Sequence, residues 1–216
     1  MSSSPSLQVL AVVPARGGSK GLPGKNLLDV GGLSLVARAV EAGRECSLVS
    51  RVICSTDSSE IAKAAEEAGA LVPGLRPPEL AGDNVPMLPV LQHVIEQAEA
   101  CGPAVDVLVL LQPTSPLRRS VHVTEALEHY LSGGCDSVVA VCEVRENPYW
   151  MRVEREGVLE PLLDRKGADY EQRQSLPEVL RINGAIYVSG REVIMDQGKV
   201  LGARTRPYRM TREASV

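Results

Sequence analysis

Residues 7–26 read LQVLAVVPARGGSKGLPGKN, an apolar run that breaks into a glycine-rich loop. The first part, 7–14, is apolar apart from Gln8, which is typical of a strand buried on both faces of a parallel sheet. The loop that follows carries four glycines and three cations, Arg16, Lys20 and Lys25, in a chain of net charge −4. Backbone N–H groups of such a loop can surround an anion, so this loop is the first candidate for a phosphate site.

Strand-like and helix-like segments alternate along the rest of the chain. The predicted strands are 51–57, 106–112, 136–142 and 181–189. Helices are predicted at 34–46, at 58–69, from Asp83 or Asn84 with Pro86 in the first turn, and at 120–131. This alternation predicts an α/β fold, a Rossmann-like, mostly parallel sheet flanked by helices, in a single domain over 1–216. Residues 143–180 break the pattern and are interpreted as a lid or a dimerisation arm.

Composition excludes several classes of protein. The 216 residues are 44% hydrophobic and 23% charged, contain no Phe, and hold no apolar run that approaches the length of a membrane span. Mild acidity and scarce aromatic residues argue against a nucleic-acid binder. No secretory signal is visible at the start, and the five cysteines form no CxxC pair. They are predicted to be buried thiols in a reducing compartment, so the expected location is cytoplasmic.

The glycine loop matches neither of the two best-known phosphate loops. A P-loop needs Gly where Ser19 stands and Ser or Thr where Asn26 stands. Gly18, Gly21 and Gly24 repeat every three residues, which differs from the GxGxxG dinucleotide fingerprint. A solvated turn is the plain alternative. The position at the carboxyl end of the first strand favours a ligand site, because α/β sheets bind ligands at that edge.

Three further segments are expected at the same edge. They are 55–57 (STD), 76–83 (RPPELAGD) and 112–118 (QPTSPLR). Ser, Thr and Asp are common in turns, so a turn is a sufficient explanation for 55–57. Gln112 is different, because a large amide at the end of an apolar strand needs hydrogen-bond partners, and a ligand can supply them.

Four motifs together resemble one enzyme family. PARGGSKGLPGKN, RPPELAGD, LLQPTSPLR and NGAIY, in this order and spacing, resemble the CMP-sialic acid synthetases, cytidylyltransferases that activate nine-carbon α-keto sugar acids. The resemblance implies that the anomeric hydroxyl of the sugar acid attacks the α-phosphorus of CTP, giving a CMP-sugar and pyrophosphate. It also implies Mg²⁺ as cofactor and a homodimer in which residues 143–180 reach the partner.

The resemblance assigns roles to individual residues. Arg16 and Lys25 match the triphosphate contacts and are the expected catalytic residues. The other positions carried over are nucleotide-binding Ser19, Lys20, Asn26, Arg76 and Asp83, and sugar-binding Gln112, Arg173 and Asn183. Arg173 would pair with the sugar carboxylate, for which a guanidinium fork is suited. The three histidines fall within predicted helices and are not expected to act as bases.

Two features depart from the family pattern. Trp150 stands where sialic acid synthetases carry a Lys directed at the sugar, which favours a differently decorated nine-carbon acid, such as a legionaminic-type or deaminated sugar. The family's Mg²⁺-holding Asp-x-Asp pair would follow directly after Val216, so no metal ligand is assigned among these residues. They are expected to bind CTP with weak or no Mg²⁺-dependent turnover. Two alternatives stay open: a nucleotidyltransferase for another sugar acid or nucleotide, and a catalytically silent nucleotide-binding protein.

Overall fold

Strand β1 (Val9–Pro14) lies inside a six-stranded sheet in the computed structural model, which describes residues 7–18, 21–163 and 176–215. Its neighbours are β2 (Arg51–Ser55) and β3 (Val107–Leu110), both parallel to it. The sheet continues through β7 (Leu180–Gly190), β4 (Ser137–Glu143) and β8 (Thr205–Arg209), in the order β2-β1-β3-β7-β4-β8. Only β7 among these described strands runs antiparallel. The prediction of a mostly parallel sheet is therefore confirmed.

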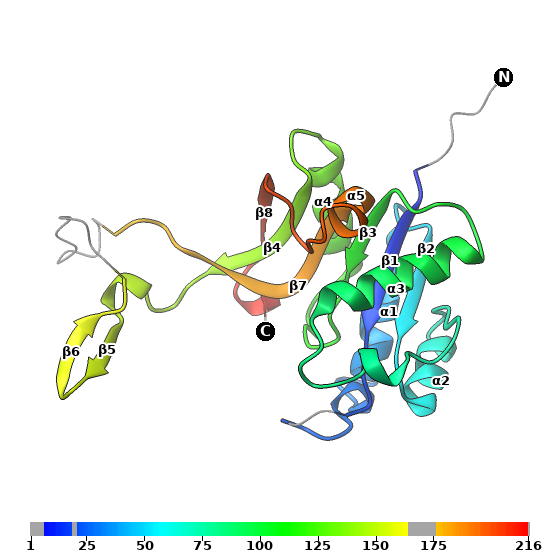
Figure 1. Cartoon of the computed structure of the whole chain (residues 1–216), viewed down its shortest axis with the longest axis horizontal. Coiled ribbons are helices and arrows are strands. Elements are labelled where there is room, and N and C mark those ends of the chain that lie inside the picture. The colour runs from blue at the N-terminus through cyan, green and yellow to red at the C-terminus, as the bar shows by residue number, and fades with distance from the viewer. Residues whose placement is uncertain (1–6, 19–20, 164–175, 216) are drawn as a thin grey trace.

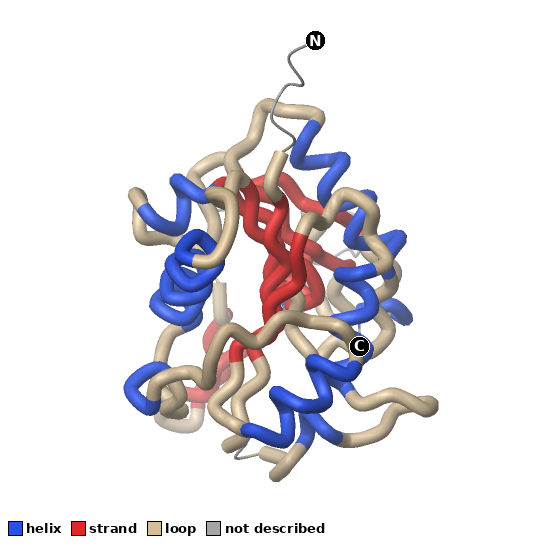
Figure 2. The backbone as a smooth tube through the Cα atoms, turned by 90° about the vertical axis from the view of Figure 1, so that its right-hand side faces the viewer, coloured by secondary structure: helices blue, strands red, loops and turns tan. Residues whose placement is uncertain are grey.

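Helices cover both faces of this sheet, as Figure 2 shows. One face packs against α1 (Leu35–Arg44), α2 (Ser59–Glu67) and α4 (Ser120–Leu131). The other packs against α3 (Met87–Ala100) and the short α5 (Arg191–Met195). Because both faces are covered, successive residues of β1 alternate between two separate apolar clusters, and the strand is apolar throughout.

Local signals explain where the helices begin. The side chains of Ser34 and Ser58 accept hydrogen bonds from backbone N–H groups of the first turns of α1 and α2. The predicted start of α3 near Asp83 is wrong: Pro86 has extended backbone angles and precedes the helix, which begins at Met87. The predicted burial of all five cysteines is also wrong, since Cys101 follows α3 on the surface and Cys135 is half-buried; all five are free thiols.

The described parts of the segment between β4 and β7, residues 144–163 and 176–179, leave the body of the molecule (Figure 1). After β4 the chain makes a 3-10 turn at Pro148–Trp150 and then a hairpin of β5 (Arg152–Arg155) and β6 (Val158–Pro161). Glu156 and Gly157 both have positive φ, 50° and 81°, as a two-residue hairpin turn requires. The predicted excursion therefore contains a 3-10 turn and a hairpin, and the role of this segment in dimerisation stays a prediction.

The sequence pattern did not reveal α5 or β8. The strand β8 has five residues, lies at the edge of the sheet and contains Pro207, so its composition does not read as a strand. Among the described residues, no helix combines the length and the apolar character that a bilayer span requires.

Candidate active site at the carboxyl edge of the sheet

The carboxyl edge of the sheet gathers the segments that the sequence singled out. Following the strand order, Asp57 comes after β2, the glycine loop after β1 and Gln112 after β3. Asn183 lies near the start of antiparallel β7, which begins at this edge, and β4 ends here at Glu143. Residues far apart in sequence thereby line one border of the sheet.

The glycine loop is held at both ends by side chains. The N–H of Gly17 donates to Oδ1 of Asp57 at 2.8 Å. Near the other end, the buried Asn26 donates from Nδ2 to the carbonyl of Arg16 at 2.9 Å. The hydrogen bond from Asn26 therefore connects the two ends of the loop. Lys25, the preceding residue, is half-buried at the start of a 3-10 turn (Lys25–Leu27).

Arg16 joins the loop to the segment that precedes α3. Its guanidinium forms an ion pair with the carboxylate of Asp83, and both side chains are about one-third exposed, 31% and 32%. The pair brings two predicted nucleotide contacts together from positions 67 residues apart. A bound triphosphate would compete with Asp83 for this guanidinium, because phosphate oxygens are equally strong acceptors.

Arg76 is buried and forms the wall of a cavity. Its Nε donates to Oγ of Ser55 at 3.0 Å and its Nη2 to the carbonyl of Ser55 at 2.5 Å. Burial lowers the pKa of Arg76, and the nearby Asp57 opposes that shift. The adjoining cavity has a volume of about 630 Å³ and is lined by Asp57, Leu75, Arg76, Pro77, Pro78, Ala81 and Gly82.

The thiol of Cys54 lies next to this wall. Burial raises its pKa to about 12, although Arg76 counteracts the shift. Cys54 is therefore a neutral thiol at physiological pH and not a nucleophile.

The side chain of Gln112 lies against Gly184, the residue that follows Asn183 in β7. Gly184 has φ of +81°, and the side-chain Oε1 of Gln112 lies 3.4 Å from the point that a Cβ on Gly184 would occupy. Asn183 is engaged within the protein: its Nδ2 donates to Oγ of Ser215 at 2.9 Å, and its Oδ1 accepts from the N–H of Ala185 at 3.0 Å.

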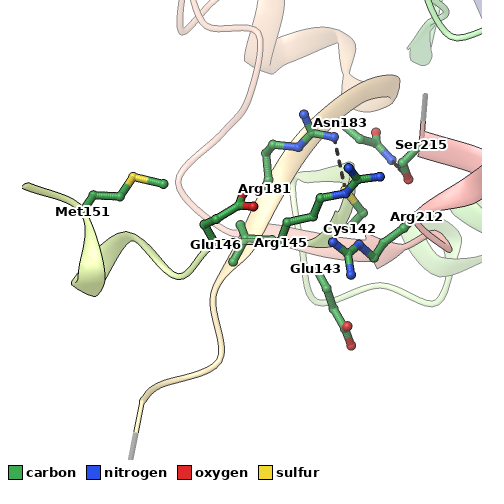
Figure 3. A pocket seen from close by; sticks show the side chains of 10 residues that line it. Cys142, Glu143, Arg145, Glu146, Met151, Arg181, Asn183, Arg212 and Ser215 are labelled. Carbon is green, nitrogen blue, oxygen red and sulfur yellow. Dashed lines mark hydrogen bonds between the residues drawn. The ribbon is translucent and has the colours of Figure 1, made fainter. Parts of the chain in front are cut away.

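A second cavity, of about 590 Å³, opens beside Asn183 (Figure 3). Three arginines line it, Arg145, Arg181 and Arg212, together with two glutamates. In Figure 3 the three guanidinium groups lie close together, whereas the carboxylate of Glu143 points away from them. A cavity with this lining suits an anionic, oxygen-rich ligand.

Sequence reasoning missed these three arginines. Arg145 lies in the stretch without periodicity, and Arg212 follows a strand that the sequence pattern did not reveal. Arg181 directly precedes the INGAIY segment, and this adjacency was its one available signal. The predicted ligands Ser19, Lys20 and Arg173 lie outside the described residues.

The described residues do not form a metal site of their own. No group of three or more His, Cys, Asp or Glu side chains is placed to hold an ion within the described ranges. The two carboxylates nearest the glycine loop, Asp57 and Asp83, are occupied by the Gly17 N–H and by Arg16.

Comparison with known proteins shows the family of this chain. A family model described as Cytidylyltransferase matches residues 10–212. The chain belongs to the cytidylyltransferase family. Among solved structures, this cytidylyltransferase is similar to a CMP:2-keto-3-deoxy-manno-octonic acid synthetase complexed with CTP, with a TM-score of 0.69 and 18% identity over 94% of this chain and 90% of that one. That likeness shows the fold.

Two curated relatives are similar to this cytidylyltransferase over most of its length. It is 34% identical to an N-acylneuraminate cytidylyltransferase of Streptococcus agalactiae serotype V over 97% of its own length and 50% of the relative's. It is 33% identical to a CMP-N,N'-diacetyllegionaminic acid synthase of Legionella pneumophila over 93% of its length and 86% of the relative's. The chain spans about half the length of the first of these relatives.

Proposed function

We propose that this cytidylyltransferase activates a nine-carbon α-keto sugar acid with CTP, releasing pyrophosphate and a CMP-sugar. The observation that carries the proposal is the arrangement of two cavities at one sheet edge. One is lined by Arg76 and by Asp57, which holds the glycine loop, and the other is lined by three arginines. The relatives that share most of this chain are named for sugar acids of this class.

In this proposal the nucleotide lies on the β1–β2 side of the site. Arg16 and Lys25, with Ser19 and Lys20, hold the triphosphate, and Arg16 and Lys25 stabilise the charge that develops on departing pyrophosphate. Arg76 and Asp83 border the pocket for the cytidine. When the triphosphate binds, the ion pair between Arg16 and Asp83 breaks, and the guanidinium of Arg16 contacts the phosphates instead.

The sugar acid lies on the β7–β4 side. Its carboxylate meets the arginine-lined cavity or Arg173, and Gln112 and Asn183 contact its hydroxyl groups. Trp150, which is 45% exposed at the root of the hairpin, replaces a Lys of the sialic acid pattern and favours a less polar decoration of the sugar.

We also infer Mg²⁺ dependence, a homodimer and a cytoplasmic location. A divalent ion balances the charge of a triphosphate, and Mg²⁺ takes few protein ligands and several waters. The projecting hairpin supports the dimer, and five free cysteines support a reducing compartment.

The test is pyrophosphate release measured over a matrix of nucleotides and α-keto sugar acids, with Mg²⁺ titrated and then removed by chelation. We expect turnover with CTP and a nine-carbon acid, lost on chelation. Turnover with another nucleotide, or only with an eight-carbon acid, would replace the proposal with the broader nucleotidyltransferase alternative. Binding of CTP without turnover of any acid would favour a silent nucleotide-binding protein.

A further inference from the structure

Arg118 is a buried cation that the proposed chemistry does not use. Only 4% of its surface is exposed. None of the ion pairs between described residues includes it. An arginine without a carboxylate partner is costly to bury, so its hydrogen bonds need an explanation.

Those hydrogen bonds connect two neighbouring strands where they separate. Nη1 of Arg118 donates to the carbonyl of Gln112 at 2.9 Å and to the carbonyl of Ala185 at 2.9 Å. The antiparallel pairing of β3 with β7 ends at Leu110 and Tyr187. Continued by two residues, the same register sets Gln112 opposite Ala185. The guanidinium therefore joins two carbonyls at the point where the ladder stops.

A cationic donor is suited to this place. Two carbonyl dipoles that face a common point repel each other, and a charge-assisted donor between them removes the repulsion. Burial lowers the pKa of Arg118 to about 9, which leaves the side chain protonated at neutral pH. Its Nε is buried without a partner, so the guanidinium is held through Nη1 and not by a full set of acceptors.

The same loop is closed by backbone contacts around this guanidinium. The N–H of Ser115 donates to the carbonyl of Gln112 at 3.4 Å, and the N–H of Arg118 donates to the carbonyl of Ser115 at 3.2 Å. Both bonds are long, so the side chain of Arg118 supplies the shorter connection within the turn. Its hydrogen bond to the carbonyl of Ala185 also connects this turn to β7.

We propose that Arg118 is a positioning residue, which sets the separation between Gln112 and the Asn183–Gly184 part of β7 and thereby shapes the sugar side of the site. This inference rests on the proposed function. The side chain of Gln112 already lies against Gly184, so a small displacement of either carbonyl moves the amide that faces the sugar. Misplacement by about 1 Å can cost about 100-fold in rate.

The experiment compares Arg118→Lys and Arg118→Ala with Arg119→Lys. Arg119 is the exposed neighbour that precedes α4, which makes it a matched control. Initial rates are measured while either CTP or the sugar acid is varied. Arg118→Lys should raise the KM for the sugar acid, and thereby lower kcat/KM for it, about 10- to 100-fold. The KM for CTP should stay within about twofold, and Arg119→Lys should resemble the unmodified protein. Added guanidinium ion should partly restore Arg118→Ala.

A merely structural role predicts a different result. If Arg118 only supported the fold, its replacement would lower the fraction of active protein, and hence kcat. Both KM values would stay unchanged, and guanidinium would not restore activity. This outcome would overturn the inference. Hydrogen exchange of peptides covering 111–118 and 180–190 provides a readout independent of turnover. Faster exchange in both peptides of Arg118→Lys is expected, and unchanged exchange would also overturn the inference. If the unmodified protein converts no sugar acid, the proposed function is wrong, and hydrogen exchange alone decides the role of Arg118.

Discussion

Arg16 and Lys25 lie on the same loop but differ in their ion pairing. Arg16 is paired with Asp83, whereas no ion pair between described residues includes Lys25. The loop itself is shaped by Asp57 and Asn26. The cations can therefore be removed without removing the contacts that form the loop.

Replacing Lys25 with Ala should lower turnover far more than stability. Loss of one donor to developing phosphate charge typically costs about 2.7–4 kcal/mol of barrier, or about 10²–10³ in kcat. The measurements are kcat for pyrophosphate release and Tm by differential scanning fluorimetry. Arg16→Ala should behave similarly, with a small additional change in Tm from loss of its partner. Turnover close to normal in both variants would remove the loop from the mechanism.

The loop geometry can be tested at Asp57. Asp57→Ala removes the acceptor of the Gly17 N–H, which should weaken CTP binding about 10-fold, because an unsatisfied backbone donor costs about 1–3 kcal/mol. Asp57→Asn retains an acceptor oxygen and should lose less. Isothermal titration with CTP measures both affinities. Equal losses in the two variants would show that the charge of Asp57 matters and its hydrogen bond does not.

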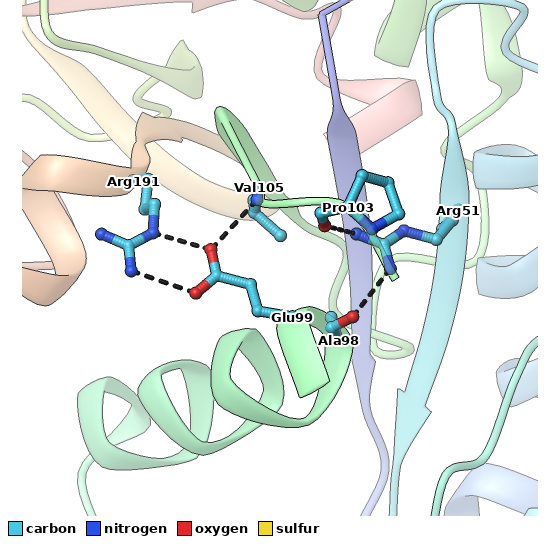
Figure 4. A network of polar contacts seen from close by, with 6 residues as sticks. All are labelled: Arg51, Ala98, Glu99, Pro103, Val105 and Arg191. Atoms are coloured by element: carbon cyan, nitrogen blue, oxygen red, sulfur yellow. Dashed lines mark hydrogen bonds and ion pairs between the residues drawn. The ribbon is translucent and has the colours of Figure 1, made fainter. Parts of the chain in front are cut away.

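At the scale of elements, a polar network fixes α3 and α5 at the opposite edge of the sheet (Figure 4). Arg191 at the start of α5 donates to both carboxylate oxygens of Glu99 in α3, at 2.8 and 3.0 Å. The same carboxylate accepts from the N–H of Val105 at 3.0 Å. Arg51 of β2 meanwhile donates to the carbonyls of Ala98 and Pro103 at the end of α3. The turn between α3 and β3 is thus held by side chains from two other elements.

Glu99→Gln should destabilise the fold by about 1 kcal/mol, since the pair is bidentate but partly exposed. The hydrogen bond from Arg191 lowers the pKa of Glu99. The pair's contribution is therefore fully present above the ordinary pKa of a glutamate and is lost as pH falls through the lowered folded-state value. Urea unfolding at pH 7 and at pH 3 measures this: the difference between Glu99→Gln and the unmodified protein should shrink at pH 3.

The exposed pair Lys63–Glu67, with a separation of 3.9 Å, provides the control. Glu67→Gln should change the free energy of unfolding by less than about 0.5 kcal/mol at either pH. A loss from Glu99→Gln no larger than this control would show that the bidentate pair does not stabilise the α3–α5 contact.

At the scale of the whole molecule, the hairpin is the segment without a visible packing partner in the described chain. In Figure 1 it stands away from the sheet and helices. Its exposed apolar residues include Val158 and Leu159, with 61% and 69% of their surface accessible. Such a projecting apolar surface is typical of a contact with another molecule, and a second copy of this chain is the partner proposed above.

Val158→Asp with Leu159→Asp should convert the dimer to a monomer. A charged side chain buried in an apolar interface without a partner is strongly unfavourable. Light scattering after size-exclusion chromatography, at micromolar concentration, measures the mass. Glu160→Gln on the same hairpin serves as the control and should remain dimeric. An unmodified protein that is already a monomer would refute the dimer proposal directly.

Local patterns in the sequence determined the type and order of most elements. The run 9–14 is apolar at every position, which is typical of a strand covered on both faces. Ser34 and Ser58 mark helix starts by hydrogen bonds that act within three residues. The fold class and the carboxyl-edge location of the glycine loop follow from such short-range rules. The short β8, with Pro207, has no such signature.

Tertiary structure alone decided which side chains meet. The contact between Gly17 and Asp57 spans 40 residues, and the contact between Arg118 and Ala185 spans 67. Arg145, Arg181 and Arg212 share a cavity only because β4, β7 and the segment after β8 are neighbours in the sheet. Each arginine is ordinary in its own stretch of sequence. The strand order depends on the combined packing of all the helices and strands, which no local pattern encodes, so the arginine-lined cavity appeared only with the fold.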